Sequence, residues 1–272
     1  SADFMINSVF YPSLQQIKLC TGEELLALPP SHPYAKKFAG SKYVKSNPQN
    51  IYKKVSEKIR AGNKVMFIGL PCQVAAVKNY IKKCDNLYTI DLICHGSPSP
   101  QILSGFLHEN NVDIQSISEL KFRNKEGFGL QSGYKRISFD NESDLYTFAF
   151  LTSLDYTENC YSCRYATLDR VSDITLGDSW GSELEAEEQK KGISLILCQT
   201  EKGKELLNNT KIELRDVDLN KAVEANHQLS HPSKMPTERK IFFKNIDKGF
   251  YHAISRCHPK MYYIRRLKYL LH

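Results

Sequence analysis

Short apolar runs alternate with stretches of helical spacing in the first half of the chain. Residues 64–68 and 86–93 are rich in β-forming side chains, which predicts two buried strands. Residues 72–83 carry apolar side chains at helical spacing, and Ser99 with Pro100 opens another helix, since proline is favoured at the first helical position. This order of elements predicts a parallel βαβ unit over about residues 60–112.

The pattern changes after about residue 112. Short strand-like segments follow one another, and a helix is expected at 202–208; the expected strands are 116–123, 134–140, 144–150, 174–176 and 193–199. From about residue 218 the chain reads as helical, with a break at 232–236. We therefore expect an α/β (mixed α+β) protein, with a βαβ unit, a mixed or antiparallel β region and C-terminal helices. The predicted division is one domain over 1–217, with its β region at about 113–217, and a helical segment over 218–272.

Composition excludes several classes of protein. Of 272 residues, 41% are hydrophobic and 25% are charged, and 37 Lys and Arg against 30 Asp and Glu give a net charge of +7. This balance excludes a disordered chain, and no apolar run approaches the roughly 20 residues of a membrane span. The first residues do not form a secretory signal. We expect a cytoplasmic protein whose eight cysteines stay reduced.

Four of the cysteines occupy positions that indicate a shared site. Cys72 lies at the turn after the first predicted strand, and Cys94 follows the second. Because adjacent parallel strands end at the same edge of a sheet, these two thiols should lie close together. Cys160 and Cys163 form a Cys-x-x-Cys pair in a polar loop, and two such thiols can bind one metal centre. Four thiolates suit an iron–sulfur cluster or tetrahedral zinc.

The spacing alone leaves other interpretations open. A structural zinc ribbon usually takes two Cys-x-x-Cys pairs, and this sequence has one such pair among the four, so a cluster is favoured over zinc. A redox dithiol and the absence of any site are further alternatives. The remaining cysteines are expected to be bystanders: Cys198 as a buried core thiol, and Cys20, Cys84 and Cys257 in polar surroundings. His95 next to Cys94 is expected either to interact with a ligand or cofactor or to be structural.

Three further patterns have weaker implications. The segment Gly-Asp-Ser-Trp-Gly at 177–181 holds the single tryptophan, which is expected either beside a site or in the core. The segment Gly-Ser-Lys-Tyr-Val-Lys-Ser at 40–46 could bind phosphate but lacks the spacing of a Walker loop. The C-terminal residues form a basic amphipathic helix, expected to pack on the domain, with contact to a membrane surface or an acidic partner as the alternative.

Four motifs in order resemble a known family. They are Gly-Leu-Pro-Cys-Gln at 69–73, Asp-Leu-Ile-Cys-His-Gly-Ser-Pro-Ser-Pro at 91–100, Cys-Tyr-Ser-Cys-Arg-Tyr-Ala at 160–166 and Ser-Asp-Ile-Thr-Leu-Gly-Asp-Ser-Trp-Gly at 172–181. Together they resemble the coenzyme F420 hydrogenase/dehydrogenase beta-subunit family, mainly its C-terminal domain. The resemblance extends roughly from residue 1 to residue 250.

The resemblance implies an iron–sulfur flavoprotein oxidoreductase. Cys72, Cys94, Cys160 and Cys163 would then hold a 4Fe-4S cluster, with FAD as the second carrier. By motif position, the candidates for FAD contacts are Lys42, Ser46, Gly69 and Gln73. A redox partner such as ferredoxin is expected, the small-molecule electron acceptor is unidentified, and no catalytic residue is assigned. The mild charge gives little support for nucleic-acid binding.

The chain also departs from the family pattern. The usual N-terminal ferredoxin-like segment and the Ser-Ser-Gly-Gly stretch are missing, so we expect a fragment whose retention of FAD is open. Gly-Leu-Pro-Cys replaces the usual Gly-Thr-Pro-Cys, and Gly-Asp-Ser-Trp-Gly replaces Gly-Asp-Phe-Trp-Gly. The sequence leaves the oligomeric state and the use of deazaflavin open. The alternative function is a non-catalytic domain whose cysteines bind zinc or a cluster structurally.

Overall fold

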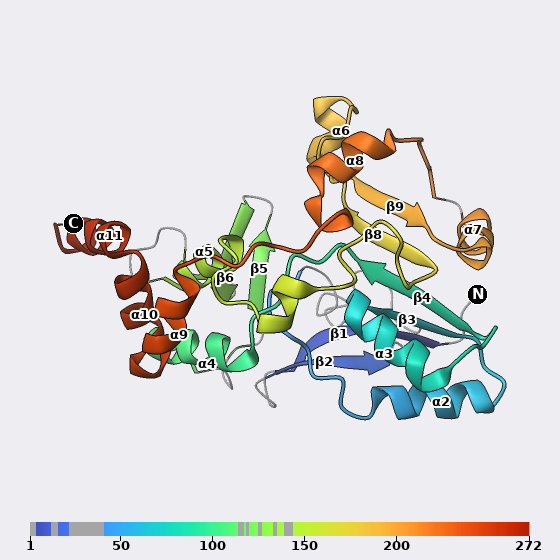
Figure 1. The fold of residues 1–272 in the computed structure, drawn as a ribbon, viewed down its shortest axis with the longest axis horizontal. Coiled ribbons are helices and arrows are strands. Elements are labelled where there is room, and N and C mark those ends of the chain that lie inside the picture. The colour runs from blue at the N-terminus through green and yellow to red at the C-terminus, as the bar shows by residue number, and fades with distance from the viewer. Residues whose placement is uncertain are drawn as a thin grey trace.

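A six-stranded, mostly parallel sheet forms one end of the molecule (Figure 1). The computed structural model describes residues 4–11, 16–21, 41–113, 117, 120–124, 127–132, 135–138, 144–210 and 212–271, with the backbone alone for the first two ranges. The strands of this sheet are β1 (Phe4–Tyr11), β2 (Gln16–Thr21), β3 (Val65–Gly69), β4 (Leu87–Leu92), β8 (Ile174–Asp178) and β9 (Ser194–Cys198), in the order β2-β1-β3-β4-β8-β9. The inner strands β1, β3, β4 and β8 pair in parallel, whereas β2 and β9 close the edges antiparallel.

The predicted βαβ unit is confirmed. The described helices are α2 (Ile51–Arg60), α3 (Pro71–Ile81), α4 (Pro100–Glu109), α5 (Leu145–Leu151), α6 (Ala186–Lys191), α7 (Glu201–Asn208), α8 (Leu219–Ala225), α9 (Arg239–Asn245), α10 (Phe250–Cys257) and α11 (Pro259–Leu271). Helix α3 connects β3 to β4, and its buried face packs with α2 against these strands around Val55, Phe67 and Val77. The carboxyl ends of β3 and β4 therefore lie at the same edge of the sheet. Cys72 and Cys94 come shortly after these strand ends in the sequence.

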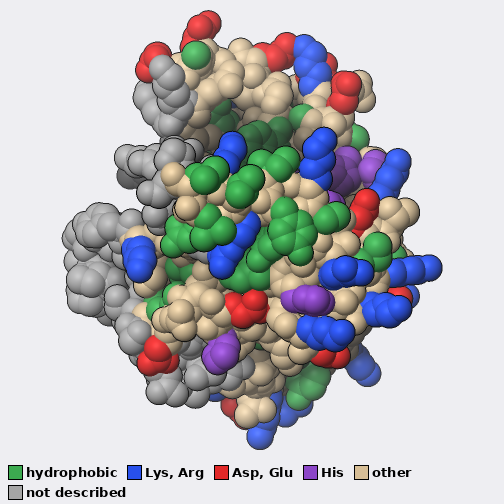
Figure 2. Space-filling view, turned by 90° about the vertical axis from the view of Figure 1, so that its left-hand side faces the viewer, with side chains coloured by type: hydrophobic (Ala, Val, Ile, Leu, Met, Phe, Trp, Pro, Cys, Tyr) green, Lys and Arg blue, Asp and Glu red, His purple; other side chains and the backbone are tan. Residues whose placement is uncertain are grey.

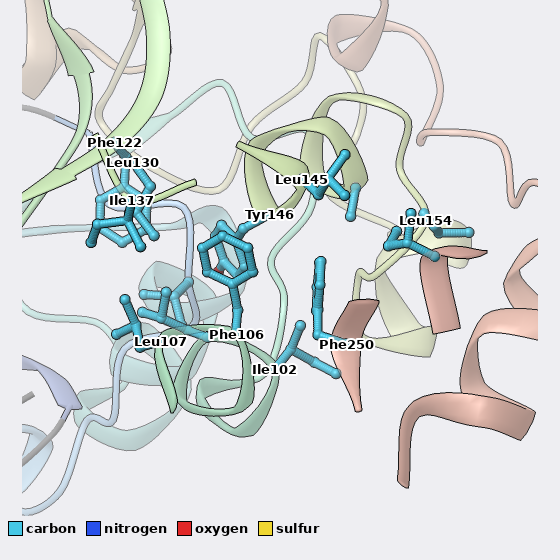
Figure 3. Close-up of a cluster of buried hydrophobic side chains, with 14 of the residues drawn as sticks. Ile102, Phe106, Leu107, Phe122, Leu130, Ile137, Leu145, Tyr146, Leu154 and Phe250 are labelled. Carbon is cyan, nitrogen blue, oxygen red and sulfur yellow. The ribbon is translucent and has the colours of Figure 1, made fainter. Parts of the chain in front are cut away.

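A second core lies between the C-terminal helices and a small antiparallel sheet. This sheet contains β5 (Leu120–Asn124), β6 (Gly127–Ser132) and β7 (Lys135–Arg136). Figure 3 shows Phe106, Tyr146 and Phe250 meeting within this core, and all three are almost fully buried. Figure 1 places α9, α10 and α11 at the end of the molecule opposite the large sheet.

One expected strand is a helix. The sequence predicts extended backbone over 144–150, but α5 begins after Asp144, whose carboxylate accepts a 2.6 Å hydrogen bond from the Thr147 amide. Five of the seven residues of α5 are buried, so apolar side chains occur on most sides of the helix. The sequence therefore lacks the alternation of apolar and polar residues that identifies a helix. The expected strand at 134–140 is confirmed only over the two residues of β7, and positions 134, 139 and 140 lie outside the described residues.

The C-terminal segment is helical, as predicted. The proposed boundary between 1–217 and 218–272 stays a prediction. Within the described ranges, no helix has the length and apolarity needed to cross a bilayer.

Candidate thiol site

The four cysteines singled out by the sequence line one cavity of about 270 Å3. Cys72 lies in the first turn of α3 and Cys94 lies two residues beyond β4. Cys160 lies in the 3-10 helix Glu158–Ser162, and Cys163 follows it directly. The structure thus brings together thiols from three segments that lie far apart in the sequence.

The turn before Cys72 is built by three residues of the Gly-Leu-Pro-Cys-Gln motif. Gln73 accepts a 2.9 Å hydrogen bond from the Leu70 amide, and Pro71 occupies the start of the helix. A side chain at Gly69 would place its Cβ 2.9 Å from a ring atom of Phe67 and 3.0 Å from Gln73 Oε1. The glycine therefore lets the Gln73 side chain fold back over the turn and fixes Cys72 at the amino end of α3, where the helix dipole favours a thiolate.

Burial and mutual proximity both act on the thiols. Burial raises the pKa of Cys94 to about 12, and the neighbouring thiolates of Cys160, Cys72 and Cys163 contribute to the increase. Burial also raises the pKa of Cys72, which the Lys45 ammonium lowers and Cys163 and Cys160 raise. Cys72 and Cys94 therefore lie close enough to the other thiols for the charge of those thiols to act on them.

The charged side chains that line the cavity are cations. Lys45, Arg164 and Arg170 contribute to its wall together with His95, and no Asp or Glu among the described residues does so. A site of this kind compensates the negative charge of several thiolates held together. Lys45 also donates a 3.4 Å hydrogen bond to Thr157, whose hydroxyl lies 3.3 Å from Cys160 Sγ.

Backbone contacts fasten the Cys94 loop to the Cys160 loop. The Thr157 amide donates to the carbonyl of Ser97 at 3.0 Å, and Pro98 forms an isolated β-bridge with Tyr156. Gly96 has φ +150°, and a Cβ there would lie 2.1 Å from the ring of Tyr156. This close approach requires glycine, which explains the Cys-His-Gly sequence after β4.

A buried ion pair between Arg170 and Asp91 stabilises both loops. Arg170 Nε lies 3.4 Å from the Asp91 carboxylate, and both side chains are almost fully buried. The guanidinium also donates 2.8 Å hydrogen bonds to the carbonyls of Leu92 and Tyr165. Burial raises the pKa of Asp91, while the nearby Arg170 guanidinium lowers it. No sequence pattern singles out Arg170, which lies seven residues after Cys163 and between the motifs at 160–166 and 172–181.

The spacing of the thiols bears on the kind of centre that could bind. Among the described residues, no three His, Cys, Asp or Glu side chains come close enough to hold a single metal ion. The cavity is also large for one ion, since a cavity needs only about 10–15 Å3 to hold one water molecule. The four thiols therefore line one cavity without forming a described group that is close enough to hold a single ion.

The residues proposed for FAD form a different arrangement. Gln73 Nε2 donates a 2.7 Å hydrogen bond to Ser46 Oγ, and both side chains are buried. With Gly69 they brace the segment at 42–46 against the β3–α3 turn. Lys42 is half-buried at the start of that segment. Their contact with a flavin stays a prediction.

Among the cysteines whose side chains the structure describes, Cys84, Cys198 and Cys257 do not line this cavity. Cys198 is expected in the core but is exposed, because it ends the edge strand β9. Cys84 and Cys257 are half-buried free thiols, and the side chain of Cys20 lies outside the described residues. His95 lines the cavity, and its Nδ1 lies 2.6 Å from Gln228 Nε2, which also approaches His227 at 2.8 Å.

The tryptophan motif lies beside a second cavity. Trp180 is 44% exposed, so of the two alternatives that the sequence left open for it, packing in the core is wrong. Asp178 accepts a 2.5 Å hydrogen bond from Arg123, whose guanidinium carbon lies 5.7 Å from the Trp180 ring centre. Trp180 lines a cavity of about 590 Å3 that shares no lining residue with the thiol cavity in the described part of the chain.

Comparison with known proteins identifies the family of the chain. A family model described as the C terminus of the beta subunit of coenzyme F420 hydrogenase/dehydrogenase matches residues 62–220, which is more than half of the chain and includes all four cavity cysteines. A chain of the F420-reducing [NiFe] hydrogenase complex from Methanosarcina barkeri has a similar fold, with a TM-score of 0.50 and 20% identity over 92% of this chain and 84% of that chain. No curated protein matches the chain. The chain therefore belongs to the family of the C-terminal domain of coenzyme F420 hydrogenase/dehydrogenase beta subunits.

Proposed function

We propose that Cys72, Cys94, Cys160 and Cys163 hold a 4Fe-4S cluster and that the chain is an electron-transfer module of an oxidoreductase. The observation that carries the proposal is the convergence of four thiols on one cavity whose other charged lining residues are cations. A thiolate-ligated cluster has a net negative charge, so Lys45 and Arg164 complement it, whereas the charge of Arg170 is balanced by Asp91. When bound, the cluster would supply one-electron transfer.

Each neighbouring residue has a physical role in this proposal. Hydrogen bonds to cluster sulfurs and nearby cations raise a reduction potential, because they stabilise the added electron. The Thr157 hydroxyl at 3.3 Å from Cys160 Sγ supplies such a contact, and Lys45 holds that hydroxyl. Arg170 keeps the Leu92 and Tyr165 carbonyls in place, so that the Cys94 and Cys163 loops stay aligned.

The side of the cavity formed by the Cys160 loop is where we expect electrons to enter or leave. Asn159, Ser162 and Arg164 line the cavity and are exposed. A redox protein such as ferredoxin could therefore approach the thiols over this loop. The acceptor molecule and the cytoplasmic setting stay predictions from the sequence.

A flavin remains part of the proposal only as an implication of the family. Three of the four residues predicted to contact FAD form the buried Gly69–Gln73–Ser46 brace, and two of them satisfy their side-chain hydrogen bonds within it. These residues do not form an open flavin site in the described part of the chain.

A structural zinc site is the alternative that the spacing favours less. Zinc requires its ligands around a single point, and no described group of three ligands is so close.

Anaerobic purification followed by reconstitution with iron and sulfide distinguishes a 4Fe-4S cluster from a zinc site. We expect bound iron and sulfide in equal amounts and a broad absorption band at about 400 nm that dithionite bleaches. A colourless protein that instead retains one zinc per chain would contradict the cluster.

A further inference from the structure

The last helix carries most of the excess charge of the chain. Residues 248–272 contain six Lys and Arg side chains and no Asp or Glu. They therefore contribute six positive charges to a chain whose net charge is +7. Four of these cations, Lys260, Arg265, Arg266 and Lys268, belong to the 13-residue helix α11. A charge of one sign concentrated in one amphipathic element indicates a surface for an anionic partner.

One face of α11 packs against the domain. Met261 and Tyr262 are half-buried and contact the core cluster that contains Phe250 and Ile254. Arg265 is half-buried on the same side. No described residue of α11 is fully buried, so the helix rests on the domain along this narrow strip. The sequence-based expectation of a terminal helix packed on the domain therefore describes only one of its faces.

The opposite face exposes large apolar side chains. At 100° per residue, five residues form a stripe directed away from Met261 and Tyr262. Their exposed fractions are 60% for Tyr263, 47% for Ile264, 59% for Leu267, 69% for Leu270 and 76% for Leu271. Figure 2, which views this end of the molecule, shows hydrophobic side chains gathered across the middle of the face with Lys and Arg side chains among and beside them. A continuous exposed apolar stripe of this kind marks an interaction site.

Cations border the stripe on both sides. By helical position, Arg266 follows the edge marked by Leu270, and Lys268 follows the edge marked by Ile264. Long basic side chains in such positions keep their charge at lipid headgroups while the apolar residues enter the acyl boundary. We propose that α11 is an interfacial helix that binds the surface of an anionic lipid bilayer, with its Tyr263–Leu271 stripe inserted.

The charge pattern favours a bilayer over a second copy of the chain. A symmetric dimer through α11 would place Arg266 and Lys268 of one copy near the same cations of the other, and like charges across an interface oppose association. A bilayer rich in anionic lipid instead presents a charge of one sign opposite the cations. The proposal does not depend on the thiol site.

Vesicle sedimentation with the full chain tests the proposal. The probes are phosphatidylglycerol-containing vesicles and pure phosphatidylcholine vesicles, each at low and high salt. We expect binding to the anionic vesicles that weakens at high salt. Leu267→Glu should weaken it about tenfold or more, because it places a charge in the inserted stripe, and Lys268→Glu should weaken it by a similar factor.

Leu151→Glu is the matched control, since Leu151 is 52% exposed at the end of α5, outside this helix. It should leave vesicle binding unchanged. The proposal is overturned if the wild type does not bind anionic vesicles, if it binds both compositions equally, or if Leu267→Glu and Leu151→Glu have the same effect. Loss of a dimer on Leu267→Glu in sedimentation equilibrium, without vesicle binding, would overturn it in favour of a second copy on the stripe.

Discussion

Arg170 Nη2 donates a 2.8 Å hydrogen bond to the carbonyl oxygen of Leu92, two residues before Cys94. The other terminal guanidinium nitrogen, Nη1, donates to the carbonyl of Tyr165, two residues after Cys163. One buried side chain therefore connects the two loops that bring these thiols to the cavity, and Asp91 balances its charge. This connection makes Arg170 a positioning residue for the proposed cluster ligands.

Replacing Arg170 should destabilise the protein strongly. Arg170→Met leaves the Asp91 carboxylate buried without its partner, and we expect the free energy of unfolding to fall by about 3–5 kcal/mol. Arg170→Lys cannot hold both carbonyls, so it should also lower the free energy of unfolding. The loss should be smaller than for Arg170→Met, because the lysine retains the charge that pairs with Asp91. Arg164→Met, on an exposed side chain of the same cavity, should cost less than about 0.5 kcal/mol. Urea unfolding measures all three, and equal losses for Arg170→Met and Arg164→Met would contradict this role.

Gly96 should tolerate no side chain. Gly96→Ala combines a φ of +150° with a Cβ placed 2.1 Å from the buried Tyr156 ring, and we expect a loss of about 3 kcal/mol or more. Gly105→Ala is the control, because a Cβ at Gly105 in α4 meets no atom within 4 Å. That change should stabilise the protein by up to about 1 kcal/mol. Thermal unfolding that ranks the two variants in the opposite order would show that the loops are not docked through Gly96.

Gln73 and Ser46 should be energetically coupled. Gln73→Ala leaves the Leu70 amide and the Ser46 hydroxyl without their partner, and we expect a loss of about 1–3 kcal/mol. Ser46→Ala removes one of the same hydrogen bonds, so the double variant should lose less than the sum of the single losses, by about 1 kcal/mol. A double-mutant cycle from urea unfolding measures this difference. Strict additivity would mean that the brace does not act as a unit.

Asp155 should make stability depend on pH. Burial raises its pKa from 3.8 to about 8, and its carboxylate oxygens accept no hydrogen bond from the described residues. Between about pH 4 and pH 8 the folded protein retains a proton that the unfolded chain has lost, so the free energy of unfolding decreases as pH rises and levels off above about pH 8. Asp155→Asn should remove this decrease, and the exposed change Asp85→Asn should not. Parallel wild-type and Asp155→Asn profiles over this range would contradict the assignment.

The sequence predicts those elements that glycine and proline delimit. Strand β3, helix α3 and strand β4 follow from short apolar runs separated by Gly69 and Pro71, and their parallel order places Cys72 near Cys94. In contrast, the apolar stretch after Asp144 has no visible period because α5 is buried on most sides, so length and composition did not separate helix from strand.

The features that the sequence did not reveal depend on tertiary position. Cys198 ends an apolar run, but that run is an edge strand, and its last residue is exposed. Arg170 lies in a polar stretch with no motif of its own, and only the fold shows that its guanidinium reaches Asp91 and the ends of two loops. Arg123 pairs with Asp178 across 55 residues, which no local pattern indicates.

The cysteines provide the most direct test of the account. Bound iron is measured after anaerobic reconstitution for the wild type and for five single variants: Cys72→Ser, Cys94→Ser, Cys160→Ser, Cys163→Ser and Cys198→Ser. We predict about four iron atoms per chain in the wild type and in Cys198→Ser, and substantial loss of iron with loss of the absorption band in each of the other four. Equal iron content in all five variants would contradict the assignment of the thiol cavity as a cluster site.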